Sequence, residues 1–192
     1  MSTSKKNLII YASLSGNTKK VAEKIAETFE RHGWENTLVQ IDQNYRNIGS
    51  IPDFDAFDFI CVGSGVFWHI PFDPLLSIIR SATHRTSYGK IVPGPRLGLA
   101  FATYGGAHLG PKEALATLEL LEIAFEHLGF QSFGRLAVPG RVSHYHGNNQ
   151  QTPSWYFPDI HLRPTADDLA MVERYVNDML SRDQFQKVYG ST

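Results

Sequence analysis

A hydroxyl-rich turn near the N-terminus has the residue types needed to hold a phosphate. Residues 8–11 are apolar, and the turn after them contains three hydroxyls, a glycine and an amide: Ser13, Ser15, Gly16, Asn17 and Thr18. Hydroxyls and amides donate hydrogen bonds, and a glycine lets the backbone approach a ligand closely. An amphipathic helix begins near Asn17, so its free N–H groups point into the same space. These groups predict an anion site made of neutral donors and a helix dipole.

This turn differs from two common phosphate-binding motifs. It has neither the Lys-Ser/Thr ending of a P-loop nor the spaced glycines of a dinucleotide-binding turn. A plain turn with a helix cap would use the same residue types. The turn is the first strand-to-helix junction of an α/β chain, and that position favours the phosphate site over the plain cap.

The same residues resemble a known family. Ser13-Leu14-Ser15-Gly16-Asn17-Thr18 is similar to the FMN-phosphate loop of flavodoxins, whose pattern is Ser/Thr-x-Ser/Thr-Gly-x-Thr. The resemblance implies that FMN is the cofactor and that this loop binds its phosphate.

Short apolar runs alternate with stretches of helical period along the chain. The apolar runs cover residues 8–11, 37–41, 57–63, 96–103 and 131–138, and the helical stretches cover residues 16–32, 72–84, 111–129 and a segment from 165. Such alternation is typical of a parallel sheet with helices on both faces. With the resemblance, it predicts a flavodoxin-like three-layer α/β sandwich of four helices on a five-stranded parallel sheet in the order 2-1-3-4-5.

A length of 192 residues predicts a single domain over residues 1–192. An extended loop is expected at residues 139–164, rich in Gly, Asn, His, Pro and aromatic residues, and loops of this length are usually functional or locally packed. A C-terminal helix is expected at about residues 165–182, because Thr165 and Asp168 have the spacing of a capping box.

The composition excludes several classes of partner. A net charge of −1 provides no electrostatic attraction for nucleic acid or an anionic membrane surface.

The single cysteine, Cys61, lies in an apolar run and is expected to be buried in a strand. No run approaches the ~20 apolar residues of a membrane span, and no apolar signal region precedes the first strand. We therefore expect a cytoplasmic protein.

Two further loops follow the third and fourth apolar runs, at the edge where open parallel sheets bind ligands. They resemble the second and third flavin loops of flavodoxins, and the resemblance implies cofactor contacts at Ser64, Gly65, Val66, Phe67, Trp68, His69, Thr103, Tyr104, Gly105 and Gly106. Gly65 could adopt a positive φ and turn a carbonyl toward the flavin. Trp68 or Tyr104 would stack on the ring. The alternatives are that Phe67 and Trp68 pack on the following helix, and that Gly105-Gly106 is only a tight bend.

Histidines occur in these loops and beyond them. His69 and His108 could contact the flavin or donate a proton, although most loop histidines are simply solvated. His144 and His146 lack nearby cysteine or carboxylate ligands, so the sequence predicts no metal site.

The resemblance implies an FMN-binding protein that acts in electron transfer, with no catalytic side chain. The partner would be a redox protein or an NAD(P)H- or quinone-type small molecule, and a homodimer is compatible with the sequence. The chain is nearly neutral, whereas flavodoxins that act as electron carriers are strongly acidic. In addition, no Asp or Glu occurs in the second and third loops before Asp73 and Glu113. This departure favours the alternative of an NAD(P)H-dependent quinone or flavin reductase. The third interpretation is a phosphate- or protein-binding module without redox function.

Overall fold

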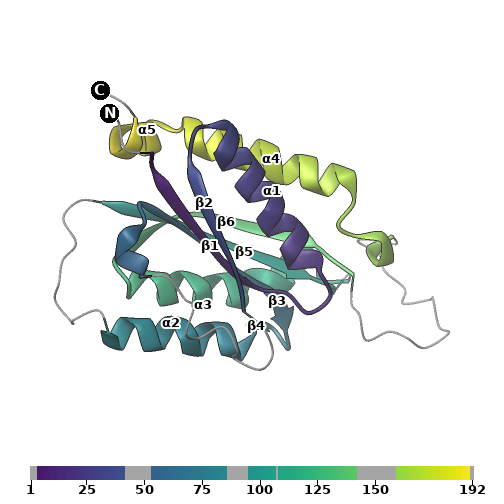
Figure 1. Ribbon diagram of the computed structural model, residues 1–192. Coiled ribbons are helices and arrows are strands. Elements are labelled where there is room, and N and C mark those ends of the chain that lie inside the picture. The colour runs from purple at the N-terminus through teal and green to yellow at the C-terminus, as the bar shows by residue number, and fades with distance from the viewer. Residues whose placement is uncertain (1–3, 42–52, 86–94, 107, 142–158, 191–192) are drawn as a thin grey trace.

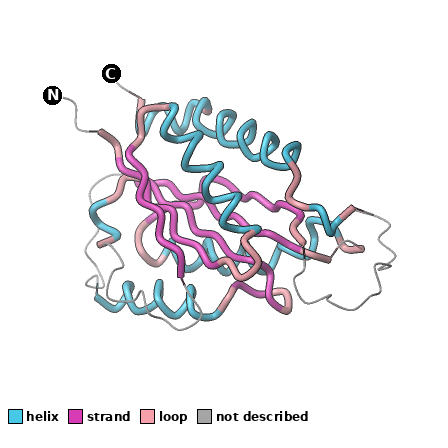
Figure 2. The backbone as a smooth tube through the Cα atoms, turned by 45° about the vertical axis from the view of Figure 1, so that its right-hand side comes forward, coloured by secondary structure: helices cyan, strands magenta, loops and turns pink. Residues whose placement is uncertain are grey.

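A parallel sheet between two layers of helices forms the framework of the protein (Figures 1 and 2). The computed structural model describes residues 4–41, 53–85, 95–106, 108–141 and 159–190. The sheet contains β1 (Lys6–Ala12), β2 (Glu35–Ile41), β3 (Phe59–Phe67), β5 (Arg96–Tyr104) and β6 (Phe130–Pro139). Its strands pair in the order β2-β1-β3-β5-β6, and all four pairings are parallel. The predicted fold class and strand order are confirmed.

One short strand was not predicted. Strand β4 (Ile70–Pro71) pairs antiparallel with the end of β3, so that Val66 faces Pro71 and Phe67 faces Ile70. The third predicted strand therefore continues beyond residue 63 and turns back on itself in a two-residue hairpin. A two-residue strand is too short to leave a periodic pattern in the sequence.

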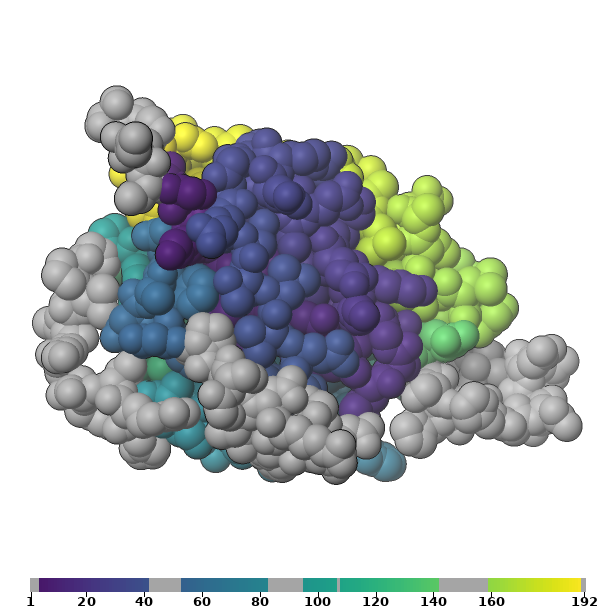
Figure 3. All heavy atoms as spheres, viewed as in Figure 1, coloured from purple at the N-terminus to yellow at the C-terminus, as the bar shows by residue number. Residues whose placement is uncertain are grey.

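The helices divide between the two faces of the sheet (Figure 1). One face carries α1 (Asn17–Arg31), α4 (Ala166–Ser181) and α5 (Asp183–Tyr189), and the other carries α2 (Asp73–Arg85) and α3 (Leu115–Glu126). Short 3-10 helices occupy Phe54–Ala56, Gly110–Ala114 and Ile160–Leu162. Figure 3 shows α1 and β2 filling the middle of the face in view, with α4 beside α1.

Two details of the predicted helices are wrong. The described residues contain a fifth helix, α5, whose seven residues are too few to show a helical period. The helix expected from residue 111 begins at Leu115, because residues 110–114 form a 3-10 helix with Pro111 in its first turn. The predicted cap of α4 is confirmed: the Thr165 hydroxyl accepts from the Asp168 N–H, and the Asp168 carboxylate accepts from the Thr165 N–H.

Side chains of successive strand residues enter two separate cores. In β1, Leu8 and Ile10 join the core under α2 and α3, while Ile9 and Tyr11 join the core under α1, α4 and α5. The strands are buried on both faces, which explains why they read as continuous apolar runs. No helix among the described residues is long and apolar enough to cross a membrane. The single-domain organisation over residues 1–192 stays a prediction, and most of the 139–164 segment lies outside the described residues.

Close packing between β3 and β5 predicts that Gly63→Ala destabilises the fold. A Cβ at Gly63 would overlap the ring of Phe101, whereas a Cβ at Gly65 would meet its nearest atoms at 3.7 Å and 3.9 Å. We expect Gly63→Ala to lower the free energy of unfolding by about 1–3 kcal/mol, as overpacked cores do. Urea unfolding measures this, with Gly65→Ala as the matched control on the same strand. Equal stability of the two variants would contradict the packing argument.

The burial of Cys61 predicts a thiol that is inert in the folded protein. Its side chain is fully buried in the sheet, as the sequence predicted, and burial raises the pKa of the thiol. Because the thiolate is the reactive form, both access and ionisation are suppressed. We expect no reaction with a thiol reagent at pH 8 in buffer and full labelling in urea. Rapid labelling of the native protein would show that β3 opens to solvent.

Candidate functional site

Three loops meet at the carboxyl ends of β1, β3 and β5. Thr18, at the start of α1, and Thr103, at the end of β5, share a buried hydrogen bond of 2.8 Å between their hydroxyls. Gly65 of β3 lies close to both hydroxyls, which would be the nearest atoms to a Cβ at this position, at 3.7 Å for Thr18 and 3.9 Å for Thr103. The sequence predicted all three residues as ligands of one cofactor. The structure brings them together at the point where strand order reverses, which is where open α/β sheets bind ligands.

The first loop leads directly into α1. Gly16 is the N-cap residue with φ 84°, a left-handed conformation that glycine adopts readily. Since Gly16 has no side chain, it cannot cap the helix, and Ser13 takes part of that role by accepting from the Lys19 N–H at 3.2 Å. Ser15 and Gly16 are partly exposed. The binding of an anion by this loop stays a prediction.

Asn17 has a different role from the predicted one. Its side-chain amide donates to the Arg141 carbonyl at 2.6 Å, and a Cβ at Gly140 would press on the Asn17 side chain at 3.0 Å. The amide is thus engaged with the segment after β6 instead of being directed at a phosphate. This contact places the backbone of Arg141, whose side chain is exposed, beside the first loop.

The second loop is mostly strand. Ser64 is buried, where its hydroxyl donates to the Gly65 carbonyl at 2.7 Å and accepts from the Phe72 N–H at 2.9 Å. The expectation of a positive φ at Gly65 is wrong, because Gly65 lies within β3 in extended pairing with Thr103. Instead, positive φ occurs at Trp68 (47°) and His69 (70°), the two residues that join β3 to β4.

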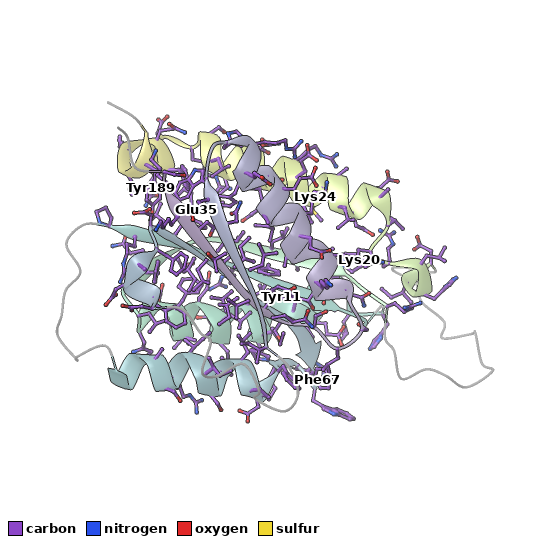
Figure 4. All side chains as sticks on the ribbon, in the orientation of Figure 1. Tyr11, Lys20, Lys24, Glu35, Phe67 and Tyr189 are labelled. Carbon is purple, nitrogen blue, oxygen red and sulfur yellow. The ribbon has the colours of Figure 1, made fainter. Side chains whose placement is uncertain are left out.

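The aromatic residues of this hairpin have separate environments. Trp68 is 90% exposed, whereas the ring of Phe67 lies 5.7 Å from that of Phe72. Phe67 thus packs against Phe72, the residue before α2, which is close to the alternative of packing on the following helix. Trp68 does not pack on a helix and is accessible for stacking. Figure 4 shows Phe67 and Lys20 toward the same end of the sheet, while Tyr189 lies at the opposite end.

The third loop is partly occupied by the protein itself. Tyr104 is 2% exposed and belongs to the core beneath α2 and α3, so its predicted stacking on a flavin is corrected to a packing role. Its carbonyl accepts from the Gly140 N–H at 2.8 Å. The Gly106 N–H donates to the carboxylate of Glu113, which lies in the 3-10 helix before α3. A ligand that uses this N–H must displace the carboxylate.

Few charged side chains lie at this edge within the described residues. Lys19 and Lys20 are exposed on the first turn of α1, and Lys19 pairs with Glu23 at 3.8 Å. His69 and His108 are both exposed. No cluster of three potential metal ligands occurs among the described residues, and His144 and His146 lie outside them.

Several residues at the site were missed by sequence reasoning. Glu113 holds the third loop, Arg141 receives the Asn17 amide, and the Thr117 hydroxyl donates to the His69 carbonyl at 3.2 Å. Thr117 is 48 positions from His69 along the chain, and Arg141 is 124 positions from Asn17. No local pattern in the sequence marks pairs at such separations.

Sequence comparison matches the part of the chain that forms the first three strands. Residues 9–67 match the family described as Flavodoxin, a range that runs from β1 through the first loop to the end of β3. The match spans less than a third of the chain, so it shows a resemblance to flavodoxins over these residues. No curated protein matches the sequence of the chain.

Solved structures extend this likeness to the whole fold. A flavodoxin from the domain Archaea is 19% identical with a TM-score of 0.59, and the match covers 95% of this chain and 98% of that one. A flavodoxin, WrbA-like protein from Agrobacterium tumefaciens is 15% identical with a TM-score of 0.59, covering 97% and 100%. The flavodiiron core of Flv1 from Synechocystis is 17% identical with a TM-score of 0.62, covering 97% and 37%. At these identities the likeness establishes the fold.

The buried threonine pair predicts strong coupling between substitutions of its two members. Thr18→Val or Thr103→Val leaves one buried hydroxyl without its partner, which destabilises proteins by about 1–3 kcal/mol. The double variant removes both hydroxyls and is expected to lose less stability than the sum of the single variants. Urea unfolding of the four proteins measures the coupling. Additive losses would show that the two loops are not joined by this bond.

Proposed function

We propose that this flavodoxin-like protein binds FMN at the three-loop edge and transfers electrons through it. The observation that supports this proposal is the Thr18–Thr103 hydrogen bond with Gly65 against it, which joins the three loops at the strand-order reversal. FMN supplies the electron-transfer chemistry when bound, so the protein has to bind, orient and shield it. No side-chain acid, base or nucleophile is needed.

The phosphate end of FMN fits the first loop. The Gly16 N-cap and the first N–H groups of α1 provide backbone donors, and the helix dipole favours an anion at this position. Ser13 and Ser15 add hydroxyl donors on the partly exposed side of the turn. The Thr18 hydroxyl and the Asn17 amide are already bonded within the protein, so we assign them to shaping the loop.

The ring end fits the second and third loops. The exposed indole of Trp68 can cover one face of a flat aromatic ring, and this contact would remove apolar surface from water. Gly65 and the Gly105-Gly106 segment let the ring approach the backbone. The Gly106 N–H becomes available to a ligand only when it loses its hydrogen bond to the Glu113 carboxylate. The carboxylate would then be a negative charge close to the bound ring.

The route by which electrons arrive separates two forms of the proposal. A carrier exchanges electrons with a partner protein, whereas a reductase takes them directly from NAD(P)H for a quinone or a free flavin. An anaerobic absorbance titration distinguishes them. Flavin bands that bleach with NADPH or NADH indicate a reductase, and bands that bleach only with dithionite or a partner reductase indicate a carrier.

The proposed phosphate site predicts a selective effect of Ser15→Ala. Loss of one hydroxyl donor should weaken FMN binding about 5- to 20-fold, since a hydrogen bond to a charged group contributes about 1.5 kcal/mol or somewhat more. Riboflavin lacks the phosphate, so its affinity should not change. Fluorescence titration of both ligands measures the difference, with Ser4→Ala as a control at the far end of β1. An equal loss for both ligands would place the phosphate elsewhere, and failure of the unmodified protein to take up either flavin would favour the non-redox binding module.

A further inference from the structure

The turn between β3 and β4 adopts a conformation that its residues disfavour. Trp68 and His69 both have positive φ, as required at the two central positions of a tight hairpin turn. Glycine and asparagine usually occupy such positions, because a Cβ clashes with the backbone there. Two consecutive residues of other types in this region of φ and ψ persist only when surrounding contacts hold them. The exposed indole of Trp68 is also unfavourable, because it leaves apolar surface in contact with water.

A hydrogen bond from α3 holds this turn. Thr117 lies in the first turn of α3 and is 0% exposed, and its hydroxyl donates to the His69 carbonyl at 3.2 Å. Threonine hydroxyls inside helices commonly bond to a carbonyl one turn earlier in the same helix. Thr28 of α1 does so, donating to the Lys24 carbonyl at 2.8 Å. The Thr117 hydroxyl instead bonds outside its own helix, to the turn residue that precedes β4, and β4 packs against α3.

We propose that Thr117 is a positioning residue for the ring end of the site. Its buried hydroxyl fixes the carbonyl of the second left-handed residue, and thereby keeps the hairpin closed with Trp68 held outward where a flavin ring would stack. Thr117 itself contacts no ligand in this arrangement and acts through the turn. The stacking role of Trp68 rests on the proposed function, whereas the hold on the turn does not.

The first test examines the turn without any flavin. A residue with positive φ gives a strong NOE between its own amide and α protons, so NMR of the ¹⁵N-labelled apoprotein reports the conformation of Trp68 and His69 directly. We expect strong cross-peaks in the unmodified protein and in Thr117→Ser, which keeps the hydroxyl. In Thr117→Val, which keeps the shape and loses the donor, both should weaken. Unchanged cross-peaks in Thr117→Val would overturn the proposal.

The second test uses a rescue that a general loss of stability could not produce. Glycine tolerates positive φ, so in a His69→Gly background the turn no longer needs to be held. We expect Thr117→Val to weaken FMN binding about 3- to 10-fold with His69 present, corresponding to the net contribution of one hydrogen bond. In the His69→Gly background, Thr117→Val should weaken FMN binding by less than about 2-fold. An equal loss in both backgrounds would overturn the coupling between Thr117 and the turn.

Controls separate this inference from the proposed function. Thr28→Val removes a matched buried helical hydroxyl far from the site, so it should lower the urea midpoint while leaving the NOE pattern and FMN affinity unchanged. If the unmodified protein does not bind FMN, the proposed function fails and the stacking role of Trp68 fails with it. The NOE comparison then still decides whether Thr117 holds the turn, because it requires no ligand.

Discussion

The parallel register of the three central strands is the constraint on which the site depends. Ala12, the last residue of β1, pairs with Ser64 of β3, and Ser64 pairs with Ala102 of β5. Beyond this level β3 continues to Phe67 and β5 to Tyr104. The loops that follow the three strands therefore lie at the same edge of the sheet. Because the pairing is parallel, the connections back to the start of each strand must cross over a face of the sheet. That requirement leaves the carboxyl edge open to the three loops.

The loops at this edge satisfy much of their own hydrogen-bonding capacity. Thr18 bonds to Thr103, the Asn17 amide bonds to the Arg141 carbonyl, and the Gly106 N–H bonds to Glu113. Buried polar groups are paired in native proteins because an unpaired group loses its hydration without compensation. A ligand at this edge therefore finds some donors free, as at Ser15 and the start of α1, and others that it must take from an internal partner. Residues whose donors are bonded within the protein shape the site, and residues whose donors are not so bonded can bind the ligand.

The unusual backbone conformation in the second loop was predicted in the correct loop but at the wrong residue. The sequence places an unusual backbone in the second loop and assigns it to Gly65, the residue best able to adopt it. In the structure Gly65 is extended and paired with Thr103, while the left-handed residues are Trp68 and His69. Trp68 and His69 each prefer a negative φ. The contact of β4 with α3 and the hydrogen bond from Thr117 outweigh that preference.

The sequence by itself determined the α/β class, the position of the first loop and the cap of α4. Each depends on a signal contained in a short stretch of chain: apolar runs of strand length, a hydroxyl-rich turn before a helix, and the spacing of Thr165 and Asp168. The strand order followed only from the resemblance to flavodoxins, because no short stretch of chain specifies which strands pair. Only the tertiary structure decided that Tyr104 is buried, that Glu113 engages the third loop and that Thr117 reaches the Trp68–His69 turn. These features depend on how separate elements pack together. Packing brings distant residues into contact according to shape and pairing, and a local sequence pattern does not encode which distant residues will meet.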